Sequence, residues 1–183
     1  MVYVMMEQGF EETELLVPVD ILRRGGVSVC IVGVSGMTAQ SSRGVTLTAD
    51  ATFDSLDFSD MEMLFLPGGQ PGVDNLGANP RVMELIERAA GNMPIAAICA
   101  APMLLGKLGL LSGRRATCYP GCETALRGAR IEDKSVVVDG SYITARGAGA
   151  AFRFAFTLLA TLRGAEAADA VARAIQYRDG RNG

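Results

Sequence analysis

The sequence predicts an α/β fold with a mostly parallel central sheet and helices on both faces. Short apolar, β-branched runs alternate with longer segments in which apolar residues recur every three or four positions. Two of the runs, 63–66 and 95–98, are apolar throughout, which is typical of strands that are buried on both faces of a parallel sheet. Ligands bind such sheets outside the carboxyl ends of the strands, so the residues that follow each run are the first candidates for a site.

The expected strands share short length and apolar content: 2–6, 27–34, 63–66, 95–98, 135–138 and 142–144, with a short extended piece at 45–48. The expected helices share apolar positions at three- and four-residue spacing: 12–24, 81–90, 102–108, 121–127, 148–162 and 165–175. Gly25 and Gly26 end the first helix, Asn79-Pro80 begins the second, and Gly164 separates the last two. We expect the polar tail, 178–183, to be frayed.

Length and composition limit the classes of protein. A chain of 183 residues with 49% hydrophobic content can bury the core of one domain, expected over 1–183. The net charge of −3 leaves no cationic surface for phosphate backbones, so we expect no nucleic acid partner. The longest nearly uncharged run, 93–106, is shorter than the roughly 17 residues that span a bilayer. With no basic apolar leader, we expect no membrane association and a cytoplasmic location.

The sequence contains no histidine, and this is its strongest exclusion. Ser-His-Asp triads, Cys-His dyads and His-containing zinc sites are all ruled out, so acid–base chemistry must use carboxyl, phenol, amine or thiol groups. The four cysteines form no CxxC pair and no dense disulfide pattern. We therefore expect reduced thiols.

Cys99 is the most informative residue. The apolar run 94–98 ends in this thiol, and Ala100-Ala101-Pro102 then begins a helix. A sharp strand-to-helix turn of this kind exposes a nucleophile, and the free N–H groups of the new helix favour its thiolate, which lowers the thiol pKa. Cysteine is also among the most buried residue types, so a small core cysteine fits the same segment.

Two other segments follow expected strands and could converge on Cys99. Glu14 lies within the first turns of a helix, where a partly buried carboxyl would have a raised pKa, stay protonated and donate a hydrogen bond to the sulfur. The amides of Gly68-Gly69 suit a close approach to a ligand oxygen, and the Ala100 amide would complete an oxyanion hole. An ordinary strand-terminating turn explains the glycine pair equally well.

Five motifs taken together resemble the ThiJ/PfpI superfamily, also called DJ-one/PfpI, and within it the Parkinson-associated deglycase branch. They are Gly9-x-Glu11-Glu12-x-Glu14, Pro18-Val19-Asp20, Leu66-Pro67-Gly68-Gly69, Ala96-Ala97-Ile98-Cys99-Ala100-Ala101-Pro102 and Arg146-Gly147-x-Gly149. The resemblance implies a flavodoxin-like sandwich in one domain of the class I glutamine amidotransferase type, and a homodimer. It also implies a catalytic Cys99 with protonated Glu14, and an oxyanion hole from Gly69 and Ala100.

The activity that the resemblance implies needs no cofactor. It is the glyoxalase III-type conversion of small 2-oxoaldehydes, methylglyoxal and glyoxal, to hydroxy acids, with deglycation of proteins or small molecules as a further possibility. The alternative is an oxidative-stress sensor that acts through oxidation of Cys99 without physiological turnover.

Tyr119 departs from the family pattern, because many members have histidine there. The replacement excludes a protease-like Cys-His pair. Tyr119 and Gly68 could orient a substrate oxygen, although a loop tyrosine also serves simply for packing. Ala148 and Ala150 are a second departure, and we expect them to loosen the start of the helix that follows.

Three further side chains have open roles. Cys118 could act as a resolving thiol after Cys99 is oxidised, or be an inert strand cysteine. Together with Cys99 and Glu14 it lacks the imidazoles that usually complete a soft-metal site, so we expect no metal. Arg24 and Arg43 are first of all solvated or helix-capping residues. The resemblance places such positions near the dimer contact, where they could attract anions.

Overall fold

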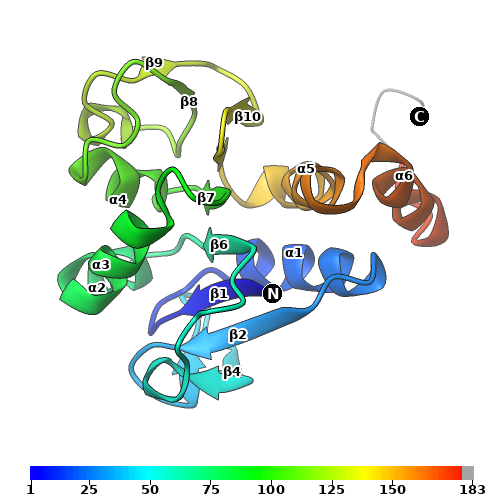
Figure 1. Ribbon diagram of the computed structural model, residues 1–183, viewed down its shortest axis with the longest axis horizontal. Coiled ribbons are helices and arrows are strands. Elements are labelled where there is room, and N and C mark those ends of the chain that lie inside the picture. Colours follow the sequence, from blue (N-terminus) through cyan, green and yellow to red (C-terminus); the bar gives the residue numbers. More distant parts are fainter. Residues whose placement is uncertain (179–183) are drawn as a thin grey trace.

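The computed structural model describes residues 1–178 and has one large sheet between two helical layers (Figure 1). The seven strands lie in the order β10 (Val136–Asp139), β11 (Tyr142–Ala145), β7 (Ile95–Ile98), β6 (Met63–Leu66), β1 (Val2–Met6), β2 (Val29–Gly33) and β5 (Ala51–Thr52). Every neighbouring pair within this sheet is parallel except β10 and β11. The predicted α/β sandwich with a mostly parallel sheet is therefore confirmed.

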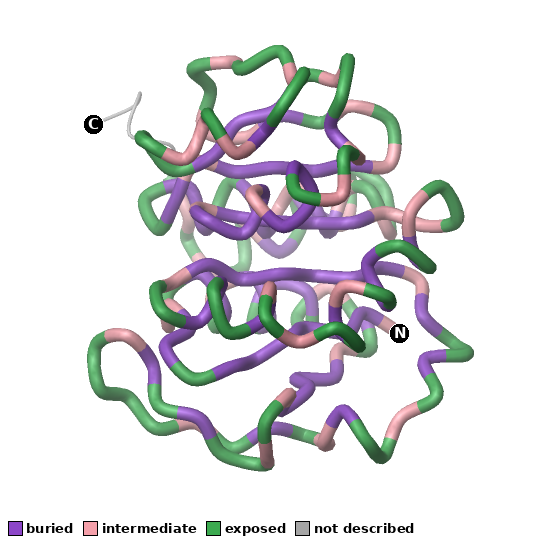
Figure 2. The backbone as a smooth tube through the Cα atoms, turned by 90° about the vertical axis from the view of Figure 1, so that its left-hand side faces the viewer, coloured by how far each residue is buried: buried purple, intermediate pink, exposed green. Residues whose placement is uncertain are grey.

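Helices cover both faces of the sheet. Helices α1 (Glu12–Arg24), α5 (Ala151–Arg163) and α6 (Ala165–Ala174) lie on one side, and α2 (Gly72–Ala78), α3 (Pro80–Ala89) and α4 (Pro102–Lys107) lie on the other (Figure 1). Alternate side chains of a strand enter opposite cores: Tyr3 and Met5 of β1 pack with α2–α4, whereas Val2 and Val4 pack with α1 and α5. Buried backbone is concentrated in the strands and inner helix faces, and the connecting loops are largely exposed (Figure 2).

Local sequence explains where the main helices begin and end. Glu11 caps α1, because its carboxylate accepts the N–H of Glu14 at 2.7 Å. Asn79 caps α3 in the same way through the N–H of Arg81, with Pro80 at the first helical position. Gly25 ends α1. These signals fix α1 at the predicted residues and α3 within a residue of its prediction.

Shorter elements lie outside the main sheet. Strands β3 (Thr38–Gln40) and β4 (Thr46–Thr48) form an antiparallel pair, and β8 (Arg115–Ala116) pairs in parallel with β9 (Arg130–Ile131). Three 3₁₀ turns occur, at Phe53–Ser55, Glu123–Ala125 and Ala148–Ala150, within the described chain. The extended piece expected at 45–48 is β4.

The predicted strands appear with slightly different ends, one predicted helix is wrong, and one helix was not expected. The helix expected at 121–127 is reduced to the 3₁₀ turn Glu123–Ala125, because Gly121 and Gly128 adopt left-handed φ values of 98° and 77°. Helix α2 was not predicted. Of the expected frayed tail, 179–183 lies outside the described residues. No helix in the described part of the chain is both long and apolar enough to cross a membrane.

Candidate active site

Cys99 occupies a sharp turn directly after β7. Its φ of 64° is a left-handed value that a residue with a side chain rarely adopts, at a cost of about 1 kcal/mol or more. The turn is held from both sides: the Cys99 N–H donates to the Ala145 carbonyl at 2.9 Å, and the Cys99 carbonyl accepts from the Tyr119 N–H at 2.8 Å. The side chain is half-buried. The predicted strand-to-helix elbow is therefore present, and Cys99 is not a fully buried core cysteine.

Glu14 reaches the elbow from the first turn of α1. Its side chain is only 1% exposed, and it hydrogen-bonds to the Cys99 thiol. The Gly68 N–H donates to Glu14 Oε2 at 3.0 Å, and the Ala148 N–H donates to the same carboxyl group. Glu14 is thus a buried carboxyl with a fixed orientation toward the sulfur, as the sequence predicted.

Gly68 and Gly69 lie beside Glu14 and Cys99, where there is no space for a larger side chain at either position. A Cβ at Gly68 would lie 2.3 Å from Glu14 Oε2 and 2.6 Å from Cys99 Cβ. Gly69 has a φ of 98°, and a Cβ there would lie 2.4 Å from the Glu11 nitrogen. The backbone N–H groups of Gly69 and Ala100 both point to the Cys99 sulfur. These are the two amides expected for an oxyanion hole.

The protonation of the pair differs from the prediction in one respect. Burial raises the pKa of Glu14 to about 7, in the expected direction. Burial and the Glu14 carboxylate raise the pKa of Cys99 to about 12, although the Ala100 and Gly69 amides act to lower it. The predicted lowering of the Cys99 pKa was therefore wrong, because α4 is six residues long and its end cannot offset desolvation beside a carboxylate.

The two groups share one proton over the range between these values. With Glu14 charged, the proton lies on sulfur; when it moves to Glu14, the carboxylate no longer opposes ionisation and the two amides stabilise the thiolate. Coupled groups of this kind titrate as a pair. A thiolate at Cys99 therefore needs Glu14 to hold the proton, which is the arrangement expected from sequence, reached by proton exchange within the pair.

Tyr119 lies at the edge of the site with its side chain 54% exposed. A Cβ added at Gly147 would approach the Tyr119 ring at 3.4 Å and Glu14 Oε1 at 3.9 Å, so Gly147 separates the phenol from the buried carboxyl. Tyr119, Arg146 and Gly147 line a pocket of about 440 Å³ that also includes Ala148. Tyr119 thus borders the approach to the pair.

The other predicted residues lie away from the two reacting groups. Cys118 is 4% exposed within the core on the α2–α4 side, and burial raises its pKa to about 12, which favours an inert thiol. Arg24 pairs with Asp20 at 2.8 Å at the end of α1. Arg43 is exposed on a loop that the Ser42 N–H ties to the Phe10 carbonyl. Their anion-attracting roles stay predictions.

The sequence did not reveal the role of backbone groups in the last strand and in the turn that follows it. The Ala145 carbonyl and the Ala148 N–H hold Cys99 and Glu14 respectively. The signal was present, because Arg146-Gly147-x-Gly149 follows a strand immediately. Within residues 1–178, no group of three or more Cys, Asp or Glu side chains is placed to hold a metal ion.

The fold and the site together define an α/β sandwich protein with a mostly parallel sheet and an elbow cysteine that faces a buried carboxyl and two backbone amides. Known proteins agree with this class. The sequence model of the DJ-1/PfpI family matches residues 1–161 of this chain. A protein of Danio rerio named "Parkinson disease protein 7 homolog" is 35% identical over 182 residues, which cover 96% of each chain.

Two further comparisons extend the match. A Pyrococcus horikoshii protein named "Deglycase PH1704" is 31% identical over 140 residues, which cover 75% of this chain and 84% of that protein. The crystal structure of Drosophila melanogaster DJ-1beta superimposes with a TM-score of 0.92 at 34% identity, over 97% of this chain and 98% of that one. The chain belongs to the DJ-1/PfpI family.

Proposed function

We propose that this protein converts small 2-oxoaldehydes to hydroxy acids, with Cys99 as nucleophile and no cofactor. The observation that carries the proposal is the buried Glu14 carboxyl hydrogen-bonded to the elbow thiol, with the Gly69 and Ala100 amides pointing at the same sulfur. A nucleophile, a proton carrier and an oxyanion site are thereby combined in one place.

The first step joins sulfur to the substrate aldehyde. With the shared proton on Glu14, the Cys99 thiolate forms a bond to the aldehyde carbon of methylglyoxal, and the carbonyl π bond breaks toward oxygen. The Gly69 and Ala100 amides stabilise the negative oxygen until Glu14 gives up its proton. The product is a neutral hemithioacetal, and Glu14 is left as a carboxylate.

The second step moves hydrogen between the two substrate carbons. Glu14, now a base, removes the proton from the carbon bonded to sulfur, giving an enediolate, and returns a proton to the neighbouring carbon. The hydroxyl proton on the first carbon moves to the oxygen of the second. The first carbon is oxidised to a thioester while the second is reduced to an alcohol, so no external oxidant or reductant is needed. Water then cleaves the carbon–sulfur bond, which releases lactate and the thiol.

The decisive experiment measures lactate formed from methylglyoxal by the wild type, Cys99→Ala and Cys118→Ala. We expect loss of activity in Cys99→Ala and near wild-type activity in Cys118→Ala, which removes a second buried thiol as a matched control. In deuterated water, the lactate should carry deuterium at its second carbon, because Glu14 exchanges its proton with solvent. Equal lactate rates for wild type and Cys99→Ala would contradict the proposal.

Deglycation is a further form of the same proposal, supported by the relative that is named a deglycase. The early adduct of an amine with methylglyoxal releases the amine and the free aldehyde, which then follows the steps above. This form requires that N-acetylarginine or N-acetyllysine is released from such adducts faster with wild type than with Cys99→Ala, because only the wild type consumes the free aldehyde.

Redox sensing by Cys99 is the second candidate, and the half-buried sulfur between two amides favours it. The thiolate would attack a peroxide oxygen, forming an S–O bond as the O–O bond breaks and an alcohol or water leaves. The amides and protonated Glu14 would then hold the new sulfur oxygens. Peroxide treatment followed by intact-mass analysis should add one or two oxygens at Cys99, with Glu14→Gln changing the extent.

A homodimer belongs to the proposal as well. Leu16 on α1 and Val45 in the loop before β4 are apolar side chains left 39% and 44% exposed, and Arg24 and Arg43 are exposed on the same two segments. Light scattering should give twice the chain mass, and Leu16→Glu should reduce it to one chain.

A further inference from the structure

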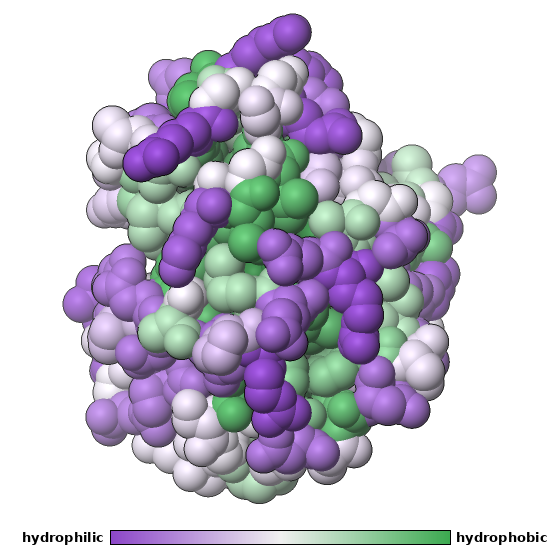
Figure 3. All heavy atoms as spheres, turned by 60° about the vertical axis from the view of Figure 1, so that its left-hand side comes forward, coloured by the Kyte–Doolittle hydropathy of each residue, from purple (hydrophilic) through white to green (hydrophobic). Residues whose placement is uncertain are grey.

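A cavity lies on the face opposite α1 and α5, and the proposed chemistry does not use it. This α2–α4 groove, about 680 Å³, is lined by Val73, Asp74, Gly77, Ala78, Met103, Leu104, Gly106, Lys107, Thr124, Ala125 and Arg127. Figure 3 brings this side forward and shows apolar side chains gathered between hydrophilic ones. The volume lies in the range of pockets that bind small molecules.

Its floor is apolar and its walls are close-packed. Val73 and Leu104 are buried at the base, and Met103 is half-buried beside them. A Cβ at Gly77 would lie 2.8 Å from Leu104 Cδ2, and a Cβ at Gly106 would lie 2.3 Å from the Ala125 carbonyl oxygen. These two glycines let the groove walls approach each other without side chains filling the space between them.

The walls continue from residues of the elbow. The Val73 N–H donates to the Gly69 carbonyl at 2.9 Å, and the Met103 N–H donates to the Ala100 carbonyl at 3.0 Å. The groove therefore begins about one helical turn from the two amides that point to Cys99. From Met103 to Lys107 it follows α4 for one turn, about 6 Å along the helix axis.

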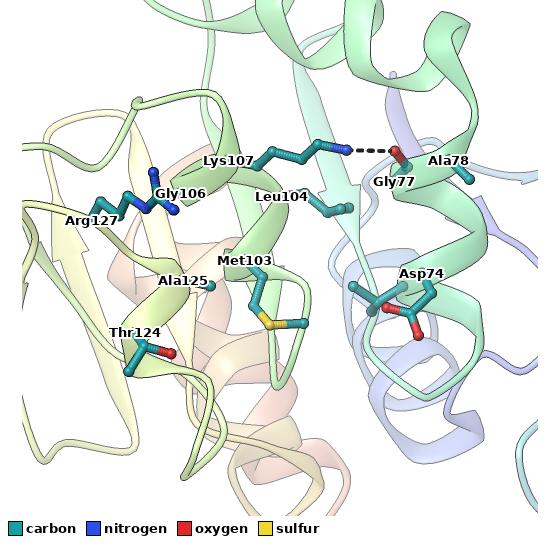
Figure 4. A pocket seen from close by; sticks show the side chains of 11 residues that line it. Asp74, Gly77, Ala78, Met103, Leu104, Gly106, Lys107, Thr124, Ala125 and Arg127 are labelled. Carbon is teal, nitrogen blue, oxygen red and sulfur yellow. Dashed lines mark hydrogen bonds between the residues drawn. The ribbon is translucent and has the colours of Figure 1, made fainter.

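Charge is distributed unequally along the groove. Figure 4 shows Asp74, Met103 and Thr124 toward one end, and Lys107, Gly77 and Ala78 toward the other. Lys107 extends across the groove, where its Nζ donates to the Gly77 carbonyl at 3.1 Å. An ammonium has three donors, so Lys107 can bind an anion while it keeps this bond. Arg127 adds a second cation to the lining.

We propose that the α2–α4 groove is a binding site for a small amphipathic anion, an aliphatic chain that carries one carboxylate. The chain lies on Val73, Met103 and Leu104, and the carboxylate is bound by Lys107. Asp74 repels the carboxylate from the opposite end and so sets the orientation. Binding does not depend on the proposed function, because no group of the ligand reacts with Cys99.

The lysine content of the chain permits a direct test. Lys107 and Lys134 are its two lysines, and Lys134 lies outside the groove in an ion pair with Glu132. The folded protein is treated with a trace of acetylating reagent with and without millimolar octanoate, and acetylation of each lysine is measured by peptide mass spectrometry. We expect octanoate to slow acetylation at Lys107 several-fold and to leave Lys134 unchanged.

Variants of the groove and a second ligand test the proposal further. Lys107→Gln should weaken octanoate binding, measured by calorimetry, by up to about fivefold, whereas Lys134→Gln should not change it. Octan-1-ol should bind more weakly than octanoate, and Ala78→Trp should occlude the groove and remove protection of Lys107. Cys99→Ala should bind octanoate normally. Equal protection of both lysines, equal affinity for octanoate and octan-1-ol, or no protection at Lys107 would each overturn the proposal.

Discussion

Cys99 and Cys118 have different surroundings, although burial raises the pKa of both thiols. The pKa of each is raised to about 12, chiefly by desolvation. Around Cys118 the further influences are Glu123, Cys122 and Arg146, and none of them is a backbone donor to the sulfur. Around Cys99, two amides point to the sulfur and a buried carboxyl can take its proton. The proton acceptor beside Cys99, and not a lower thiol pKa, distinguishes the two regions.

The largest expected difference between these two thiols is in alkylation rate. In the folded protein at neutral pH, iodoacetamide should modify Cys99 at least about 100-fold faster than Cys118, because Cys118 lacks both exposure and a proton acceptor. Peptide mass spectrometry over time measures both rates in one sample. In denaturant the two rates should become equal, and a folded-state ratio near one would remove the distinction.

The raised pKa of Glu14 should make stability depend on pH. The folded protein keeps the Glu14 proton up to about pH 7, whereas the unfolded chain releases it near 4.5. Protonated Glu14 therefore contributes its full stabilisation below pH 4.5. The free energy of unfolding falls by about 3 kcal/mol as the pH rises from there to 7.

Urea unfolding at several pH values measures the slope of the free energy of unfolding against pH. Glu14→Gln should remove it, because glutamine does not titrate, whereas Glu84→Gln, an exposed control on α3, should retain it. A slope that persists in Glu14→Gln would assign the titration to another group.

Two glycines near the pair offer a steric comparison. Gly68→Ala places a methyl group 2.3 Å from Glu14 Oε2 and must displace Glu14 or Cys99, so we expect a loss of about 1–3 kcal/mol in stability and loss of rapid alkylation. The methyl group of Gly147→Ala would lie 3.4 Å from the Tyr119 ring, which is an ordinary contact. We therefore expect little change in stability or in the rate of alkylation. Thermal unfolding and alkylation rates compare the variants. If the two variants had similar stability and alkylation rates, the close packing of Gly68 would not constrain Glu14 and Cys99.

The smallest effect is expected at Tyr119. Because its side chain is 54% exposed and the elbow uses its backbone N–H, Tyr119→Phe should change methylglyoxal turnover by less than about threefold and leave stability unchanged. Steady-state kinetics provide the measurement. A loss similar to that of Glu14→Gln would place the phenol among the groups that move protons.

Much of this arrangement could be predicted from local sequence. The run 95–98 and the small residues after Cys99 specify a buried strand and an elbow, and the position of Glu14 in α1 specifies a buried carboxyl beside the sheet edge. Helix α2 was missed because Gly72 and Gly77 weaken its pattern over seven residues. The helix expected at 121–127 was overruled by the conformation of its flanking glycines.

Electrostatics and cavities depend on tertiary structure. The raised pKa of Cys99 arises from a carboxylate that is 85 positions earlier in the chain, so no local pattern around Cys99 reveals it. The α2–α4 groove likewise combines residues from three separate segments, and none of them carries a motif.

The most direct test of proton exchange between Glu14 and Cys99 is the pH profile of Cys99 alkylation in the wild type and in Glu14→Gln. The shared proton predicts that the wild-type rate rises to pH 7 and then levels off, since the pair already contains thiolate above that pH. In Glu14→Gln, the rate should keep rising about tenfold per pH unit past the free-thiol value near 8.5. Identical profiles, or a wild-type rate that still climbs steadily toward pH 12, would contradict the account.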